Sequence, residues 1–292
     1  MTTRPVGAGL ALAAAGAVAF SGKAILAKLL YREGLDAVAV LMLRMLFALP
    51  FFLLMAWWAG RGKPALTPAQ WRRIAVLGFT GYYLASFLDF LGLQYVSASL
   101  ERLILYLNPT LVLAIGIAFH GLKVTRGQWL AVAISYVGVL LVFGQEVGEQ
   151  GPHALLGSLL VFASAVSYAV YLAQSGAMVR ELGSMRLVGL ASTVACVLCI
   201  GQYFVLRPAE ALFAITPTAL GLSLLNSVAC TVAPVMMAIE RIGPALAAQT
   251  GMVGPMSTVV LGVVVLDERF TPAMALGTGL VLVGIGMLAR KR

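Results

Sequence analysis

Five charged side chains lie inside otherwise apolar stretches of the sequence, and they are the residues best suited to bind a polar molecule. Lys23, Arg44 and Asp89 lie about two helical turns from one end of their stretches, and Glu101 and Arg102 lie about one turn in. Charges at such positions usually face a protein interior or a water-filled cavity. They form either a structural salt-bridge cluster or a site whose cations meet a substrate carboxylate and whose carboxylates meet an ammonium group.

Polar and aromatic side chains recur at helical spacing around these charges. Tyr82, Ser86 and Asp89 share one helical face, as do Glu101 and Asn108. Such stripes occur both at packed helix interfaces and along the walls of ligand sites, and tyrosines offer flat faces to aromatic or cationic groups. The predicted substrate-binding residues are Lys23, Tyr82, Tyr83, Ser86, Asp89, Glu101, Tyr106, Asn108, Ser164, Tyr168, Tyr171, Gln174, Asn226 and Gln249.

Three prolines lie inside apolar stretches, at Pro109, Pro234 and Pro255. Each lacks a backbone N–H and leaves a carbonyl free, so a kink is expected at each position. A kink of this kind acts either as a hinge that gates a cavity or as a fixed bend.

Other reactive side chains form no recognisable site. Cys196 and Cys199 have the spacing C-x-x-C, but they lie within an apolar stretch and are interpreted as packing residues. His120 and His153 are isolated near helix ends, so no metal site is predicted. The sequence contains no zinc protease, esterase or P-loop motif. We therefore expect no enzyme activity and no cofactor.

The composition is that of an integral membrane protein. Of 292 residues, 61% are apolar and only 11% are charged, with a mean hydropathy of +0.98. Soluble domains are about half apolar and about a quarter charged, whereas disordered chains have low hydrophobicity. Three cysteines are too few for a disulfide framework.

Stretches of membrane-spanning length predict ten helices, over residues 6–30, 36–58, 71–95, 98–120, 128–143, 155–178, 187–206, 218–239, 244–266 and 272–289.

The distribution of basic residues predicts the orientation of these helices. With the N-terminus in the cytoplasm, only Arg32, Arg207 and Arg269 lie on the outer side. The inner segments contain Arg4, Arg61, Lys63, Arg72, Arg73, Lys123, Arg126, Arg180, Arg186, Arg241, Arg290, Lys291 and Arg292. Both termini are therefore predicted to be cytoplasmic. The net charge of +9 is interpreted as this topology signal, and no nucleic-acid partner is expected.

The two halves of the sequence resemble each other. Residues 93–143 align with residues 239–289 without a gap, which places Asn108-Pro109 on Gly254-Pro255. Five helices are an odd number, so the second half must enter the membrane from the opposite side. The predicted fold is all-α, with ten transmembrane helices in two inverted five-helix repeats, 1–148 and 149–292.

Small residues on the predicted fifth and tenth helices allow close helix packing, either within one protomer or between two. They are Ala131, Ser135 and Gly138 on the fifth helix and Gly277 and Gly284 on the tenth. We expect a well-packed monomer in preference to a dimer.

Several segments of the sequence resemble the EamA-type transporters of the drug/metabolite transporter superfamily. The first half carries Leu93-Gln94-Tyr95-Val96-Ser97-Ala98-Ser99, Leu107-Asn108-Pro109 and Gly121-Leu122-Lys123-Val124-Thr125. The second half carries Ile242-Gly243-Pro244-Ala245, Gly254-Pro255 and Leu266-Asp267-Glu268-Arg269-Phe270-Thr271. The last segment is similar to the family's helix-end "GE-x-L/F-T" pattern, whereas the first half has Gly121-Leu122-Lys123 where an acidic residue is usual.

In length and style the sequence is most similar to the bacterial aromatic amino acid exporters. The resemblance implies a multi-pass protein of the bacterial inner membrane, with a cavity lined by helices one to four and six to nine. We predict an alternating-access secondary transporter that exports neutral, aromatic amino acids without ATP. Export of cationic or amphipathic drugs is the alternative, and a channel or a membrane-embedded enzyme are the other classes considered.

Overall fold

The computed structural model describes residues 6–122, 124–150, 153–234 and 253–289. Within these ranges the regular secondary structure is entirely helical. The elements are α1 (Val6–Arg32), α2 (Ala37–Gly60), α3 (Pro68–Gly78), η1 (Phe79–Leu84), α4 (Ala85–Leu93), α5 (Ala98–Leu105), α6 (Asn108–His120), α7 (Arg126–Gln150), α8 (His153–Leu182), α9 (Ser184–Leu206), η2 (Ala209–Ala214), α10 (Pro217–Ser227), η3 (Val228–Val232), α13 (Val253–Leu266) and α14 (Pro272–Ala289). Where they overlap the described residues, the predicted apolar stretches correspond to these helices.

Six described segments are long and apolar enough to cross a membrane, and three shorter apolar helices accompany them. The six are Ala37–Gly60, Pro68–Leu93, Ala98–Phe119, Arg126–Gly148, His153–Leu182 and Ser184–Leu206. Large apolar side chains such as Leu54, Val205 and Val264 are exposed on the outside of the bundle. An apolar exterior of this kind is suited to lipid.

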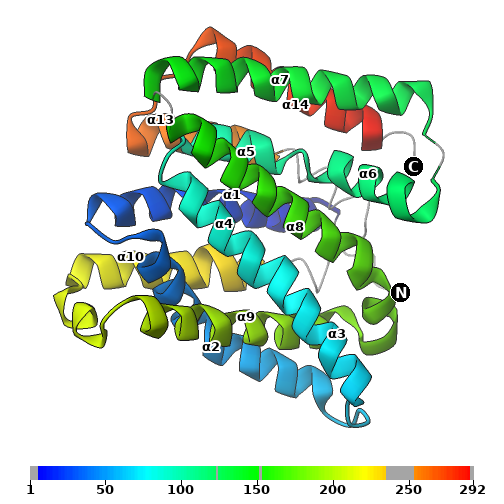
Figure 1. The fold of residues 1–292 in the computed structure, drawn as a ribbon, viewed down its shortest axis with the longest axis vertical. Helices are drawn as coiled ribbons and strands as arrows, with labels where there is room; N and C mark the ends of the chain where they lie inside the picture. The colour runs from blue at the N-terminus through cyan, green and yellow to red at the C-terminus, as the bar shows by residue number, and fades with distance from the viewer. Residues whose placement is uncertain (1–5, 123, 151–152, 235–252, 290–292) are drawn as a thin grey trace.

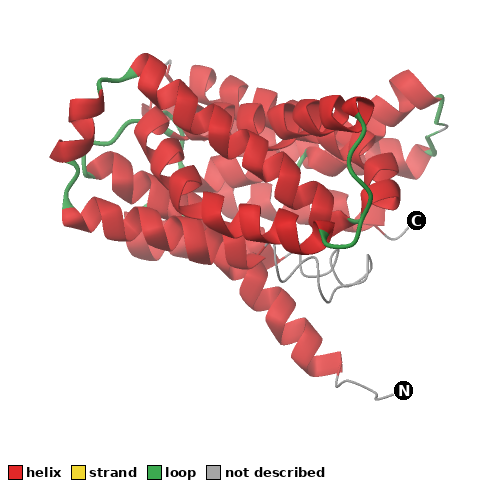
Figure 2. Ribbon diagram, turned by 90° about the horizontal axis from the view of Figure 1, so that it is seen from below, coloured by secondary structure: helices red, strands yellow, loops and turns green. Residues whose placement is uncertain are grey.

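The helices form a bundle with a pair of tightly packed helices at each end (Figure 1). Helices α7 and α14 pack together at one end, and α2 and α9 pack together at the other. Between these pairs lie α1, α4, α5 and α8. Lys23, Asp89, Glu101 and Arg102 are buried on the first three of these helices. Seen from below, the N-terminal part of α1 extends away from the bundle (Figure 2).

The predicted stretch 98–120 is broken into α5 and α6, because Pro109 has no backbone N–H to bond to the carbonyl of Leu105. The side chain of Asn108 supplies the missing donor: its Nδ2 lies 2.7 Å from Leu105 O. The kink expected near Pro109 is therefore present, and a neighbouring amide satisfies the carbonyl that the proline leaves free.

The predicted stretches 71–95 and 218–239 both contain a π-helix, which the sequence analysis did not anticipate. In the first, α3 begins after the N-cap Thr67 and is followed by η1; in the second, α10 begins after the N-cap Thr216 and is followed by η3. Both helices have proline at their start and 11 residues before the π-turn. The two halves thus share an unusual local structure at corresponding places.

Candidate functional site

Three of the predicted charged residues meet between α1, α4 and α5. Lys23 Nζ lies 2.5 Å from Asp89 Oδ2 and 3.2 Å from Glu101 Oε1. All three side chains are buried, and Glu101 is fully inaccessible to solvent. The geometry brings together one ammonium and two carboxylates in the interior of an apolar bundle, and we call these residues the charge cluster.

The charge cluster contains carboxylate oxygens that no described residue satisfies. Asp89 Oδ1 and Glu101 Oε2 are buried and accept no hydrogen bond from the described part of the chain. A buried charge without partners costs several kcal/mol or more, so native structures keep such groups chiefly where a ligand, a proton or water satisfies them. The cluster can therefore accept a further cation or proton.

Arg44 and Lys23 both lie close to the Phe90 ring. The Arg44 guanidinium is 5.1 Å from the ring centroid and Lys23 Nζ is 5.6 Å from it. Arg44 Nε donates to Thr231 Oγ1 at 2.7 Å, whereas Nη1 is buried with no partner among the described residues. Among the described residues Arg44 forms no ion pair with the charge cluster, and its bonded partner is a hydroxyl of the second half.

Arg102 also reaches into the second half, where its Nε donates to Thr258 Oγ1 at 3.0 Å. Both hydroxyls are themselves tied to backbone carbonyls: Thr231 to Asn226 O at 3.1 Å and Thr258 to Gly254 O at 3.1 Å. Arg44 therefore connects α2 to η3, and Arg102 connects α5 to α13.

The predicted tyrosine and serine stripe of α8 packs against η1 and α4. The hydroxyl oxygens of Tyr82 and Tyr171 lie 2.9 Å apart, and the Tyr168 and Tyr171 rings are stacked 5.5 Å apart. Ser164 donates to Ala85 O at 2.6 Å, and the neighbouring Ser167 donates to Thr80 O at 2.7 Å. A π-helix leaves carbonyls without their usual helical donors, and these hydroxyls supply donors there. The stripe thus holds two helices together.

The remaining predicted residues are spread over several environments. Asn226 is fully buried, and both of its amide atoms lack partners among the described residues. Tyr83 lies parallel to Phe87 with ring centroids 6.4 Å apart, and the Tyr106 hydroxyl lies against Gly254. Ser86 is half-buried and Gln174 is exposed. Pro234 is helical and is the last described residue after η3, Pro255 lies within α13, and Gln249 lies outside the described residues.

The residues at one end of the interface between α1, α5 and α13 were missed by the sequence analysis. A cavity of about 370 Å³ is lined there by Lys28, Tyr31, Arg32, Gln94, Ser97, Leu266 and Glu268. The Glu268 carboxylate accepts hydrogen bonds from Ala98 N and Ser99 Oγ, each at 2.7 Å, and so caps the N-terminus of α5. Arg32 Nη2 donates to Leu266 O at 2.7 Å. The sequence feature that could have indicated this site is Glu268, an acidic residue shortly after the apolar stretch 244–266.

A bundle of apolar helices that encloses buried charges, with an apolar exterior, defines a multi-pass membrane protein. The model of the EamA-like transporter family matches residues 7–144 and, a second time, residues 155–290. The chain belongs to the EamA-like transporter family and is a membrane transporter.

Two proteins of Bacillus subtilis (strain 168) are similar in sequence. The uncharacterized transporter YcbK is 31% identical over 273 residues, which cover 89% of this chain and 85% of YcbK. The uncharacterized transporter YetK is 25% identical over 173 residues, or 59% of this chain and 52% of YetK. A solved crystal structure matches with a TM-score of 0.62 at 16% identity over 98% of both chains, a likeness that shows the fold alone.

Proposed function

We propose that the chain exports neutral amino acids, aromatic ones in particular, across the bacterial inner membrane by alternating access. The observation that carries this proposal is the presence of buried groups of both signs, near Phe90 and the neighbouring Asp89, that no described residue satisfies. Asp89 Oδ1 and Glu101 Oε2 can accept the ammonium of an amino acid, and Arg44 Nη1 can donate to its carboxylate. The Phe90 ring is close to both cations, and we propose that an aromatic side chain of the substrate packs beside it.

We further propose that the transporter consists of two inverted five-helix repeats, 1–148 and 149–292, with both termini in the cytoplasm. The ends of α6 and α13 support this pairing. Leu122 N donates to Gly116 O at 3.2 Å, and Glu268 N, at an offset of 146, donates to Gly262 O at 3.1 Å. The two segments therefore end in the same type of helix cap.

The contact between α7 and α14 gives a second support for the repeats. A Cβ atom at Gly138 would lie 2.6 Å from Gly277 O, and one at Gly284 would lie 2.6 Å from Ala131 O. The offset of 146 relates Gly138 to Gly284 and Ala131 to Gly277. Each of the two contacts therefore has its counterpart in the other when the helices are interchanged, as expected for helices related by a pseudo-two-fold axis. Because the small faces of the fifth and tenth helices are used within one chain, they favour a monomer.

The proposed zwitterion site predicts how Arg44→Gln changes substrate choice. We expect the KM for phenylalanine to rise about tenfold, since a charge-assisted hydrogen bond contributes about 1.5–3 kcal/mol. Phenethylamine, which lacks the carboxylate, should be transported equally by the variant and the unaltered protein. Uptake of both labelled compounds into proteoliposomes measures this, with Arg73→Gln, an exposed arginine, as the control.

Two results would count against amino acid export. Transport of phenethylamine but not phenylalanine by the unaltered protein would favour the alternative, export of cationic or amphipathic drugs, for which the surplus carboxylate of the charge cluster is suited. Flux that does not saturate with phenylalanine concentration, and shows no exchange across vesicles, would indicate a channel.

We propose that the Glu268 carboxylate closes the outer side of the transporter by capping α5. Glu268→Gln keeps the shape of the side chain but weakens the two bonds from α5, so the outer side should open more often. A cysteine at Gln94, which lines the cavity there, should react about fivefold faster with a membrane-impermeant maleimide, the effect of losing about 1 kcal/mol of capping. The three native cysteines are buried, and an unchanged labelling rate would refute this role.

The prolines are proposed as hinges for this movement, with Pro109 the best placed because α5 and α6 meet next to it. The same labelling assay tests it. If Pro109→Ala changes neither the labelling rate nor transport, the bend between α5 and α6 is fixed.

A further inference from the structure

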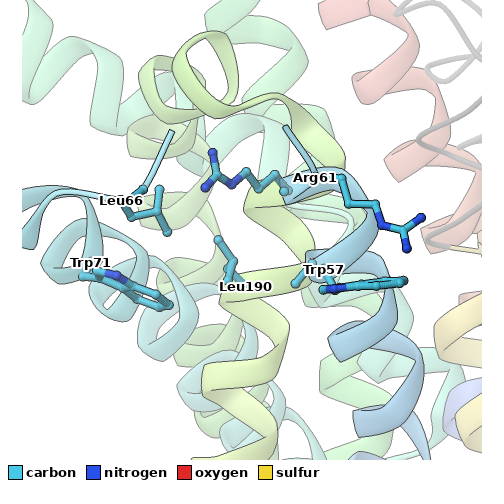
Figure 3. Close-up of a pocket in the computed structure, with 9 residues that line it drawn as sticks. Trp57, Arg61, Leu66, Trp71 and Leu190 are labelled. Carbon is cyan, nitrogen blue, oxygen red and sulfur yellow. The ribbon is translucent and has the colours of Figure 1, made fainter. Parts of the chain in front are cut away.

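A second cavity, of about 570 Å³, lies where α2 ends and where α3 and α9 begin. Its walls include Trp57, Arg61, Leu66, Trp71, Arg186 and Leu190. Figure 3 shows Trp57 and Arg61 on one side of this cavity and Leu66 and Trp71 on the other, with Leu190 between them. Neither the charge cluster nor the proposed outer closure uses any of these residues.

The cavity is positively charged. The Arg61 guanidinium stacks 3.7 Å from the centre of the Trp57 ring, and Arg186, which is 9% exposed, donates from Nη2 to Pro64 O at 3.0 Å. Neither guanidinium has a carboxylate within 4 Å in the part of the chain that the structure describes. The nearby Glu181 is bonded to Gln70 Nε2 at 2.6 Å. Two cations therefore line the cavity with no ion-pair partner among the described residues.

The surroundings of the cavity match the boundary between lipid and water. Trp57 and Trp71 are 57% and 48% exposed, and tryptophan is enriched at this depth in membrane proteins. Leu54 on α2 and Val76 on α3 are exposed on the same helices, farther along toward the membrane interior. Lys63, on the loop after α2, adds to the positive charge on the water side.

We propose that this cavity binds the phosphate headgroup of an anionic phospholipid. Arg186 in the cavity wall supplies charge-assisted hydrogen bonds to the phosphodiester, and the exposed Arg61, which is directed outward over Trp57 in Figure 3, adds positive charge at the rim. An acyl chain packs on Leu66, Trp71 and Leu190. A soluble phosphate ester offers the same headgroup chemistry, but half of the cavity wall is apolar and would be left uncovered by it.

The leaflet follows from the orientation of the helices. The loop that carries Arg61 is cytoplasmic in the proposed topology, so the lipid belongs to the cytoplasmic leaflet. This last point rests on the proposed orientation, whereas binding itself does not depend on it or on the transported substrate.

The test is native mass spectrometry of the delipidated full-length protein, titrated with phosphatidylglycerol or with phosphatidylethanolamine. The unaltered protein should bind phosphatidylglycerol in preference. Arg61→Gln should weaken binding about fivefold and the double variant R61Q/R186Q about thirtyfold. Each arginine near a membrane surface strengthens the binding of anionic lipid about fivefold, and the two factors multiply. Arg186→Lys, which keeps the charge at the buried position, should retain most of the binding. Comparison with the Gln variant separates loss of the charge from misfolding.

The matched control is the double variant R72Q/R73Q, which removes two exposed arginines of α3 that do not line the cavity. It should bind phosphatidylglycerol as the unaltered protein does. Three results would each overturn the proposal: equal weakening in this control, equal affinity for phosphatidylethanolamine, and unchanged binding in R61Q/R186Q. Displacement of the lipid by an equal concentration of glycerol 3-phosphate would assign the site to soluble phosphate esters instead.

Discussion

Lys23→Met will abolish the proposed amino acid transport and lower the free energy of unfolding by about 3–5 kcal/mol, the range for breaking a buried ion pair by removing one partner. The reason is geometric: Lys23 Nζ is the charged group that contacts both Asp89 and Glu101. Without it two buried carboxylates face each other with no cation between them. Chemical or thermal unfolding in detergent measures the loss of stability, and proteoliposome uptake of phenylalanine measures the loss of transport.

A second variant separates a structural role of the charge cluster from a functional one. In K23M/D89N/E101Q the three charges are removed together, so the electrostatic penalty disappears and most of the stability should return. Transport should remain absent, because the groups proposed to bind the substrate ammonium are gone. Recovery of transport together with stability would show that the cluster only holds α1, α4 and α5 together.

Gly138→Ala will destabilise the protein by about 1–3 kcal/mol, the usual cost of overpacking a well-packed interior. The added Cβ would lie 2.6 Å from the backbone carbonyl of Gly277 and 3.0 Å from Leu280 Cβ. A backbone atom cannot rotate out of the way as a flexible side chain can, so α7 and α14 must separate along their contact. The measurement is the unfolding midpoint of the purified protein in detergent.

Gly144→Ala on the same helix is the matched control, because a Cβ there meets no atom within 4 Å. Alanine favours helix over glycine by about 1 kcal/mol, so this variant should be neutral or more stable. The two substitutions make the same chemical change with opposite expected signs. Equal effects at both positions would mean that α7 and α14 do not pack as closely as described.

The sequence predicted those features that an apolar bilayer requires of any chain that crosses it. Charges inside apolar stretches are so costly that Lys23, Asp89 and Glu101 could be expected to meet, and they do. The kink near Pro109 was also foreseeable, since no proline can donate a helical hydrogen bond. The all-helical character of the described residues follows from the same need to satisfy backbone groups within lipid.

The sequence was less informative about which polar side chain bonds to which partner. Helical spacing places Ser164 on a polar face, but it does not show that Ala85, directly after η1, offers a carbonyl that this hydroxyl can satisfy. Arg44 looked like a partner for the carboxylates, yet its bond is to Thr231, which lies 187 positions away in the chain. Glu268 was noted only as part of a family-like segment, because its partners on α5 are distant in sequence.

The caps of α6 and α13 have the same backbone form but different side chains. Gly121 and Asp267 both adopt a left-handed conformation, with φ of 62° and 59°, yet the next residue is Leu122 in one half and Glu268 in the other. Leucine cannot accept a hydrogen bond, so only the second cap can fasten a neighbouring helix. If the two halves exchange roles during transport, this difference gives the empty carrier a resting preference. In the proposed orientation this preference is for the state closed to the outside and open to the cytoplasm, as the proposed export requires.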